Sequence, residues 1–164
     1  MILTPSIFEG ELAIGQNFSP SVEKNVEWFI KKYEPMYCHA VIGEKLYDEL
    51  LDNLTPDPSP QESGDWDTLK DKLAYSCACF VYFHYMMNMI TGTMGAGEFA
   101  TNAENSERVS PWPKMVRRWN EMVDETPGIM KWIENNSDMY PEYSPDMKLY
   151  VAYGISRHEN LWGL

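Results

Sequence analysis

Residues 66–90 read WDTLKDKLAYSCACFVYFHYMMNMI, and this stretch decides the fold. Its second half is apolar almost all round, a pattern typical of a helix that other helices cover. Asp65 precedes the stretch and is a favourable N-cap residue. The apolar part, residues 77–90, is too short to cross a bilayer. The sequence therefore predicts a mainly α protein, a helical bundle around a long central helix at about residues 66–90.

Two amphipathic segments precede this stretch. Apolar residues recur at helical spacing over residues 22–33, which predicts a first helix. Pro35 is expected to interrupt it and to start a short second helix that ends at Gly43. A third helix is predicted to run to about Leu54. Residues 55–64 contain three Pro and are interpreted as a flexible connector.

The segment after residue 90 is rich in glycine. Residues 91–101 read TGTMGAGEFAT, with three Gly within six positions, which a helix tolerates poorly. Thr, Met and Phe in this segment suit short strands. We therefore expect a small β-hairpin or a projecting loop at about residues 91–109.

A further helix is predicted from Ser110, because a capping residue there precedes Pro-Trp-Pro. Residues 126–128, Thr-Pro-Gly, are expected to break it and to leave a short last helix behind. Residues 1–19 are interpreted as an N-terminal arm or loop available for pairing with something else, and residues 137–164 as an irregular C-terminal segment. All of these lie in one domain over residues 1–164.

The charge balance excludes several classes of partner. The chain has 25 acidic and 13 basic residues, a formal net charge of −12. Such a field repels nucleic acid, whose binding requires Lys and Arg, and it disfavours anionic membranes. Residues 1–8 also lack the features of a signal peptide, so a cytoplasmic protein is expected. The most negative stretch is residues 48–67, with seven acids and no Lys or Arg.

The cysteines and histidines do not suggest a metal site. Three Cys are an odd number for a disulfide framework, and Cys77 and Cys79 would point to opposite sides of a helix. They are interpreted as small core residues. His84 is expected to be a hydrogen-bonded core histidine, and neither His39 nor His158 has ligands at a metal-binding spacing. No metal, cofactor or catalytic residue is predicted.

Two further patterns were weighed as signs of an enzyme. The glycines of residues 92–97 lack the Gly-Lys-Ser/Thr end that a phosphate-binding loop requires. Glu98 and Glu104 could act as paired carboxylates in acid–base catalysis, but in so acidic a chain some such pair arises by chance. Neither pattern therefore identifies an enzyme.

The order of several short motifs resembles a known family. The motifs are FIKKYEP at residues 29–35, VIGEKLYDEL at 41–50, TGT at 91–93, ENS at 104–106, Ser110, and Trp119-Asn120. Together they resemble the helical head-tail connector proteins of tailed bacteriophages, particularly a prophage branch common in gut bacteria. The resemblance covers roughly residues 22–133, and its motifs are structural rather than catalytic.

The resemblance implies a virion structural protein that forms an oligomeric ring between the portal and the tail. Its partners would be copies of itself and the portal and tail proteins, with DNA only as a passing cargo that is not gripped and with no membrane. It would be located in the bacterial cytoplasm during assembly and then in the virion.

A subunit interface is expected around the segment at 91–109 and the basic start of the helix that follows. A basic patch on one helix is often only a solvated face, yet opposite the acidic stretch of a second copy it would favour head-to-tail contacts. Arg108 lies just upstream of this patch. The interface residues of this hypothesis are Met94, Phe99, Val109, Lys114, Arg117 and Arg118.

Two other functions stay open at this stage. One is a small helical enzyme with a site near residues 92–105, for which a pocket containing Glu98, Glu104 or His84 with a shifted pKa would be the sign. The other is a cytoplasmic adaptor that joins other proteins.

Overall fold

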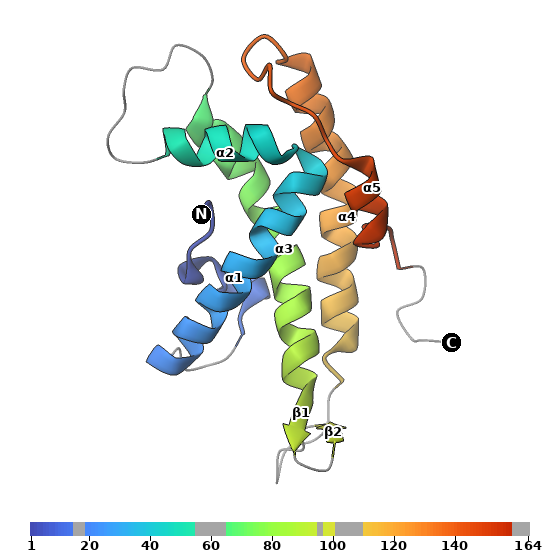
Figure 1. The fold of residues 1–164 in the computed structure, drawn as a ribbon. Coiled ribbons are helices and arrows are strands. Elements are labelled where there is room, and N and C mark those ends of the chain that lie inside the picture. The colour runs from blue at the N-terminus through green and yellow to red at the C-terminus, as the bar shows by residue number, and fades with distance from the viewer. Residues whose placement is uncertain (15–18, 55–64, 95–96, 101–109, 159–164) are drawn as a thin grey trace.

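A long central helix organises the fold. A computed structural model describes residues 1–14, 19–54, 65–94, 97–100 and 110–158, the side chains of residues 91–94 and 97–100 excepted. Helix α3 spans Trp66–Ile90 and packs against α1 (Pro20–Val41) on one side and α4 (Trp112–Asn135) on the other. Figure 1 shows this arrangement, with α2 (Glu44–Asn53) crossing one end. The protein is mainly α, as predicted.

Helix α3 confirms the prediction for residues 66–90. The Asp65 carboxylate accepts a hydrogen bond from the Thr68 backbone N–H at 3.0 Å, which caps the helix. Seven consecutive residues, Ser76–Tyr82, are buried, so neighbours cover the helix on all sides there. The three free cysteines are all buried, as expected of core residues, and burial raises the pKa of the Cys77 thiol well above its ordinary value.

The predicted break at Pro35 is wrong, because α1 continues through it to Val41. Apolar side chains on both sides of Pro35 fall on one stripe at spacings of three and four residues, and all face the core. They are Val22, Val26, Phe29, Tyr33 and Tyr37. An internal proline costs about 3 kcal/mol. Burial of the residues beyond it, at about 1.5–3 kcal/mol for each large apolar side chain, offsets that cost.

The predicted break at residues 126–128 is wrong for the same reason. Helix α4 continues through Pro127 and Gly128 to Asn135. Its buried stripe keeps the same spacing across the proline and consists of Met115, Trp119, Met122, Thr126, Ile129 and Ile133. The Thr126 hydroxyl donates to the Met122 carbonyl at 2.7 Å and is also bonded to the Tyr37 hydroxyl at 2.9 Å. This second bond fastens α4 to α1 beside the proline.

Gly43 makes the turn between α1 and α2. Its φ of +88° lies in the region that favours glycine, as the sequence suggested. A second reason comes from packing, because a Cβ built there would lie 2.3 Å from the carbonyl oxygen of Ser144. The Ser144 N–H in turn donates to the Ile42 carbonyl at 3.2 Å. The C-terminal segment is thus held against the turn, and α2 then follows as predicted.

The N-terminal arm packs on the chain's own core. It forms two short 3-10 helices, η1 (Pro5–Ile7) and η2 (Gly10–Leu12). Four apolar side chains of the arm are buried: Ile2, Leu3, Phe8 and Leu12. The described part of the arm, residues 1–14, is therefore covered by its own chain, where η1 contacts α1 and η2 contacts α3.

Three segments remain: the segment after residue 90, the C-terminal segment and the connector at residues 55–64. Strands β1 (Thr91–Met94) and β2 (Gly97–Ala100) pair antiparallel, with Thr91 opposite Ala100, whereas residues 101–109 lie outside the described part of the chain. The segment after residue 137 is not wholly irregular, because it contains a short helix, α5 (Met147–Ala152), which packs on α1. The expected connector at residues 55–64 lies outside the described residues.

Candidate subunit interface

The end of the bundle where α3 passes into β1 has the geometry of a contact surface. Ile90 ends α3 and Thr91 begins β1, so no loop separates the helix from the strand. Figure 1 shows the two strands beyond the helices, at the end of the molecule opposite α2. Met87 and Met89, at the base of the strands, expose 41% and 45% of their surface. Exposed methionines are over-represented at surfaces that bind other proteins.

Lys114 and Arg117 lie near the same end, in the first turns of α4. The Lys114 ammonium lies 5.4 Å from the centre of the Tyr82 ring and donates to the Ala13 carbonyl at 3.4 Å. Arg117 is exposed and lines a shallow pocket of about 170 Å³ with Asn120, Glu121, Asp124 and Arg157. Both cations are on the surface, where a second protein could reach them.

Arg118 departs from the interface hypothesis. Its side chain is only 5% exposed, since it lies on the inward side of α4. The guanidinium pairs with the Glu11 carboxylate of the arm and, at 2.7 Å, with Glu121, and it donates to the Tyr75 hydroxyl at 3.0 Å. Arg118 thus joins the arm, α3 and α4 within one chain and is not available to a neighbouring copy. The three basic residues do not form one patch.

The apolar half of the hypothesis stays a prediction. Strand pairing places the Met94 backbone opposite Gly97 and the Phe99 backbone opposite Gly92. The side chains of Met94 and Phe99 lie outside the described part of the chain, as does Val109.

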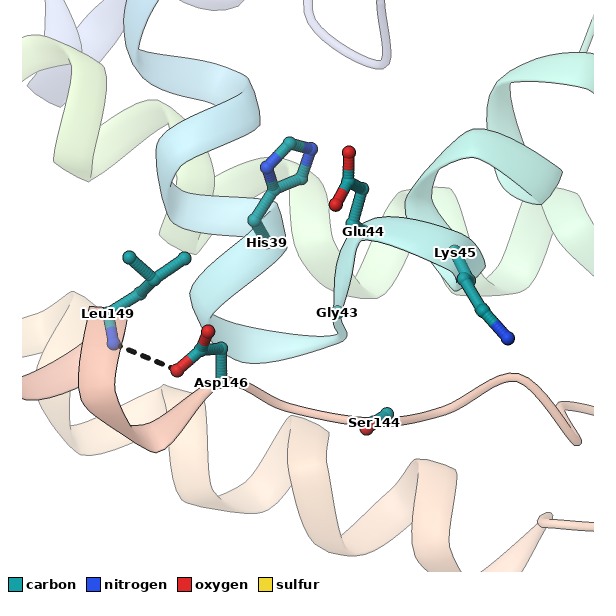
Figure 2. A pocket seen from close by; sticks show the side chains of 7 residues that line it. All are labelled: His39, Gly43, Glu44, Lys45, Ser144, Asp146 and Leu149. Carbon is teal, nitrogen blue, oxygen red and sulfur yellow. Dashed lines mark hydrogen bonds between the residues drawn. The ribbon is translucent and has the colours of Figure 1, made fainter.

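A second concave region lies at the C-terminal end of α1 (Figure 2). It has a volume of about 250 Å³ and is lined by residues around the Gly43 turn and α5: His39, Gly43, Glu44, Lys45, Ser144, Asp146 and Leu149. The Asp146 carboxylate caps α5 by accepting from the Leu149 N–H at 3.1 Å. Lys45 points away from the pocket and pairs with Glu142 at 3.4 Å. The polar groups here serve the junction of helices.

His84 packs against the core through aromatic rings rather than through the hydrogen bond that the sequence predicts. Its ring stacks on Tyr33, with 4.2 Å between centroids, and also contacts Phe80 and Trp119. Its Nε2 is buried without a hydrogen-bond partner among the described residues. Burial, and to a smaller extent the Lys32 charge, lowers its pKa from 6.5 to about 4. The shifted pKa follows from the aromatic environment, and His84 lines neither of the pockets described above.

Reasoning from the sequence missed the buried acid Glu34. Its carboxyl group is fully buried and accepts from the backbone N–H groups of Ile2 and Leu3, at 2.7 and 2.9 Å, and from the Tyr47 hydroxyl at 2.7 Å. Burial and the neighbouring Glu34 raise the Tyr47 pKa. A signal existed, because Glu34 falls four residues after Ile30 on the buried stripe once α1 is drawn through Pro35.

Two features are absent from the described residues. No group of three or more His, Cys, Asp or Glu side chains within them is placed to hold a metal ion. In the same part of the chain, no helix combines the length and the hydropathy that crossing a membrane requires.

Comparison with known proteins identifies a family. Residues 38–149 match a family described as "Family of unknown function (DUF6712)". No curated protein and no solved structure matches the chain. The family description names no activity, so the resemblance to head-tail connectors stays a prediction.

Proposed function

The chain belongs to this DUF6712 family, and we propose that it is a structural subunit of a phage or prophage head-tail connector, which assembles into a ring between portal and tail. It would act by packing and self-association, without a reaction to catalyse. The observation that carries the proposal is the direct passage of the buried helix α3 into a strand pair beyond the bundle. An element held in this way suits contact with a neighbour.

The surroundings of the strand pair support a contact role. Among the described residues β1 and β2 pair only with each other, and the outer edges of such a strand pair can accept a strand from another chain. Met87 and Met89 add apolar surface at the base of the strands, and Arg117 adds a cation on α4. Apolar contact supplies affinity, whereas the charge contributes to the choice of partner.

The net charge supports the expected relation to DNA. At a formal charge of −12 the protein would repel a phosphate backbone, so DNA could pass through a ring of such subunits without being gripped. Filter binding with double-stranded DNA at physiological salt should show no retention. Tight binding that weakens with salt would contradict this part of the proposal.

Electron microscopy tests the proposal directly. Negative-stain images of the concentrated protein, alone and mixed with the portal protein encoded with it, should show rings of uniform diameter. The matched variant Met87→Asp/Met89→Asp should lose rings but keep the far-UV circular dichroism spectrum of the parent, since both side chains are exposed. A protein that stays monomeric in both preparations would contradict the proposal.

A further inference from the structure

The N-terminal half of α1 presents a basic face with an exposed tryptophan. Trp28 is 53% exposed, and Lys24, Lys31 and Lys32 are exposed as well. At 3.6 residues per turn, the three lysines lie within about 60° of Trp28 around the helix axis. Glu23 lies about 140° away from Trp28, whereas Glu27 lies about 100° away and borders the face on the side of Lys31. Three lysines thus gather on one face of this helix in a chain whose net charge is −12.

Contacts within the chain hold two residues of this face, Trp28 and Lys32, in position. The Lys32 ammonium lies 5.1 Å from the Trp28 ring and 5.0 Å from the Tyr33 ring. Such cation–π contacts orient the side chains involved. Trp28 also packs edge-on against the buried Phe29, with 5.0 Å between ring centroids. The tryptophan is thus positioned on the core while about half of it stays accessible.

Helix α2 presents a face of the opposite charge. Glu44, Asp48 and Asp52 follow each other at four-residue intervals and are exposed. They therefore form one acidic line along the solvent side of α2. The lysine of this helix, Lys45, pairs with Glu142 at 3.4 Å, which offsets its charge.

The two faces are too far apart to meet within one molecule. About 14 Å of helix lies between Lys32 and the end of α1, and about 25 Å between Lys24 and that end, and the chain then turns at Gly43 into α2. Figure 1 shows the start of α1 pointing away from α2. Among the described residues, no ion pair joins a lysine of α1 to an acid of α2. The separation also exceeds the screening length of about 8 Å at physiological salt.

We propose that the Lys–Trp face of α1 binds the acidic face of α2 in a second copy of this chain. The contact is head to tail, because two different faces of each copy are used, and it can therefore build a ring. Trp28 would supply the apolar centre and the charges the specificity. This contact is separate from the strand end, but it rests on the self-association assumed in the proposed function.

Charge reversal tests the contact by sedimentation velocity. Lys24→Glu/Lys31→Glu and Glu44→Lys/Asp48→Lys should each weaken self-association at least tenfold, and an equimolar mixture should restore it, because each variant then meets a complementary face. Trp28→Ala should weaken association less. The control Lys131→Glu/Lys148→Glu changes the charge equally at exposed sites elsewhere and should have no effect. Circular dichroism checks that every variant is folded.

The outcomes separate this contact from the proposed function. Rings that form equally well from both reversed variants would overturn the contact and leave the connector proposal standing. Salt-sensitive open oligomers that disappear on reversal, with no rings from the parent protein, would support the contact and count against the connector. A parent protein that is monomeric at all concentrations would overturn both.

A Lys–Trp face also suits single-stranded nucleic acid, in which bases stack on aromatic rings. Fluorescence anisotropy with a labelled oligonucleotide tests this alternative. We expect no binding by the parent protein. Binding that the Lys24→Glu/Lys31→Glu variant loses, without an effect of that variant on self-association, would overturn the proposal in favour of a nucleic-acid site.

Discussion

Two buried polar groups hold the N-terminal arm, and they do so by different means. Glu34 binds the backbone of residues 2 and 3 through hydrogen bonds, and within the described residues it forms no ion pair. Arg118 binds the other end of the arm through the exposed side chain of Glu11. The Glu34 carboxyl group accepts hydrogen bonds from buried donors that solvent does not reach. In the Arg118–Glu11 ion pair, by contrast, the Glu11 side chain is exposed to solvent. The Glu34 site should therefore contribute more to stability.

Removal of the carboxyl group of Glu34 should have the largest effect. Glu34→Ala leaves two backbone N–H groups and the Tyr47 hydroxyl buried without acceptors, at about 1–3 kcal/mol each. We expect the free energy of unfolding to fall by about 4 kcal/mol in urea denaturation. The matched variant Tyr47→Phe removes one donor and should cost about 1 kcal/mol. A loss below about 1 kcal/mol for Glu34→Ala would show that the arm contributes little to stability.

Replacement of Arg118 should have the next largest effect. Arg118→Met keeps most of the buried stem but leaves Glu121 and Tyr75 without their cation. We expect a loss of about 2–3 kcal/mol, measured in the same way. Glu11→Gln, at the 74% exposed end of the ion pair, should cost less than about 1 kcal/mol. Equal losses for the two variants would mean that the Glu11 contact dominates.

The pH dependence should reveal a third polar group, His84, which is partly buried. Its pKa is lowered from 6.5 to about 4 in the folded protein, so the unfolded chain binds more protons between these two values. Stability should therefore fall as the pH drops from about 6.5 to about 4. The His84 contribution, reduced for partial exposure to solvent, is about 1–2 kcal/mol. The variant His84→Phe should lack this part of the decline in stability. If the dependence of stability on pH is unchanged in that variant, other groups cause the decline.

The smallest effect is expected at the surface. Arg157 and Asp124 form an ion pair with two short N–H···O contacts, of 2.5 and 2.6 Å, but both side chains are more than half exposed. Arg157→Ala should lower the free energy of unfolding by less than about 1 kcal/mol, and less still in high salt. A loss as large as that of Arg118→Met would remove the distinction between buried and exposed cations.

The central helix and the short helix before residue 54 were predictable because their patterns are local. An apolar run and a capping aspartate are sufficient to identify α3, and the spacing of Leu46 and Leu50 identifies α2. Pro35 and Pro127 each led to a wrong prediction of a helix break, because proline locally disfavours a helix. The apolar stripe nevertheless continues at the same spacing through both prolines. That stripe is visible in the sequence and would have corrected both predictions.

The polar anchors and the surface faces were harder to predict. Glu34 can be placed on the buried side of α1 by its phase, but its partners are backbone groups more than 30 residues away, for which the sequence holds no signal. Arg118 is grouped with Lys114 and Arg117 in the predicted basic patch because the three lie close together in sequence, yet adjacent helix residues point in different directions and Arg118 faces inward. The opposite charges of α1 and α2 are local patterns, yet their separation becomes evident only when the turn at Gly43 is known.

The absence of a loop between Ile90 and Thr91 has a mechanical consequence. A hinge needs residues that can change their backbone angles freely, and here helix α3 continues directly into strand β1. A force applied to the strand pair is therefore delivered to the aromatic cluster around Phe80 and His84 instead of being absorbed at the junction. Two glycines inserted after Ile90 would uncouple the strand pair from α3. The domain should keep its melting temperature, while the strand pair would lose its fixed direction.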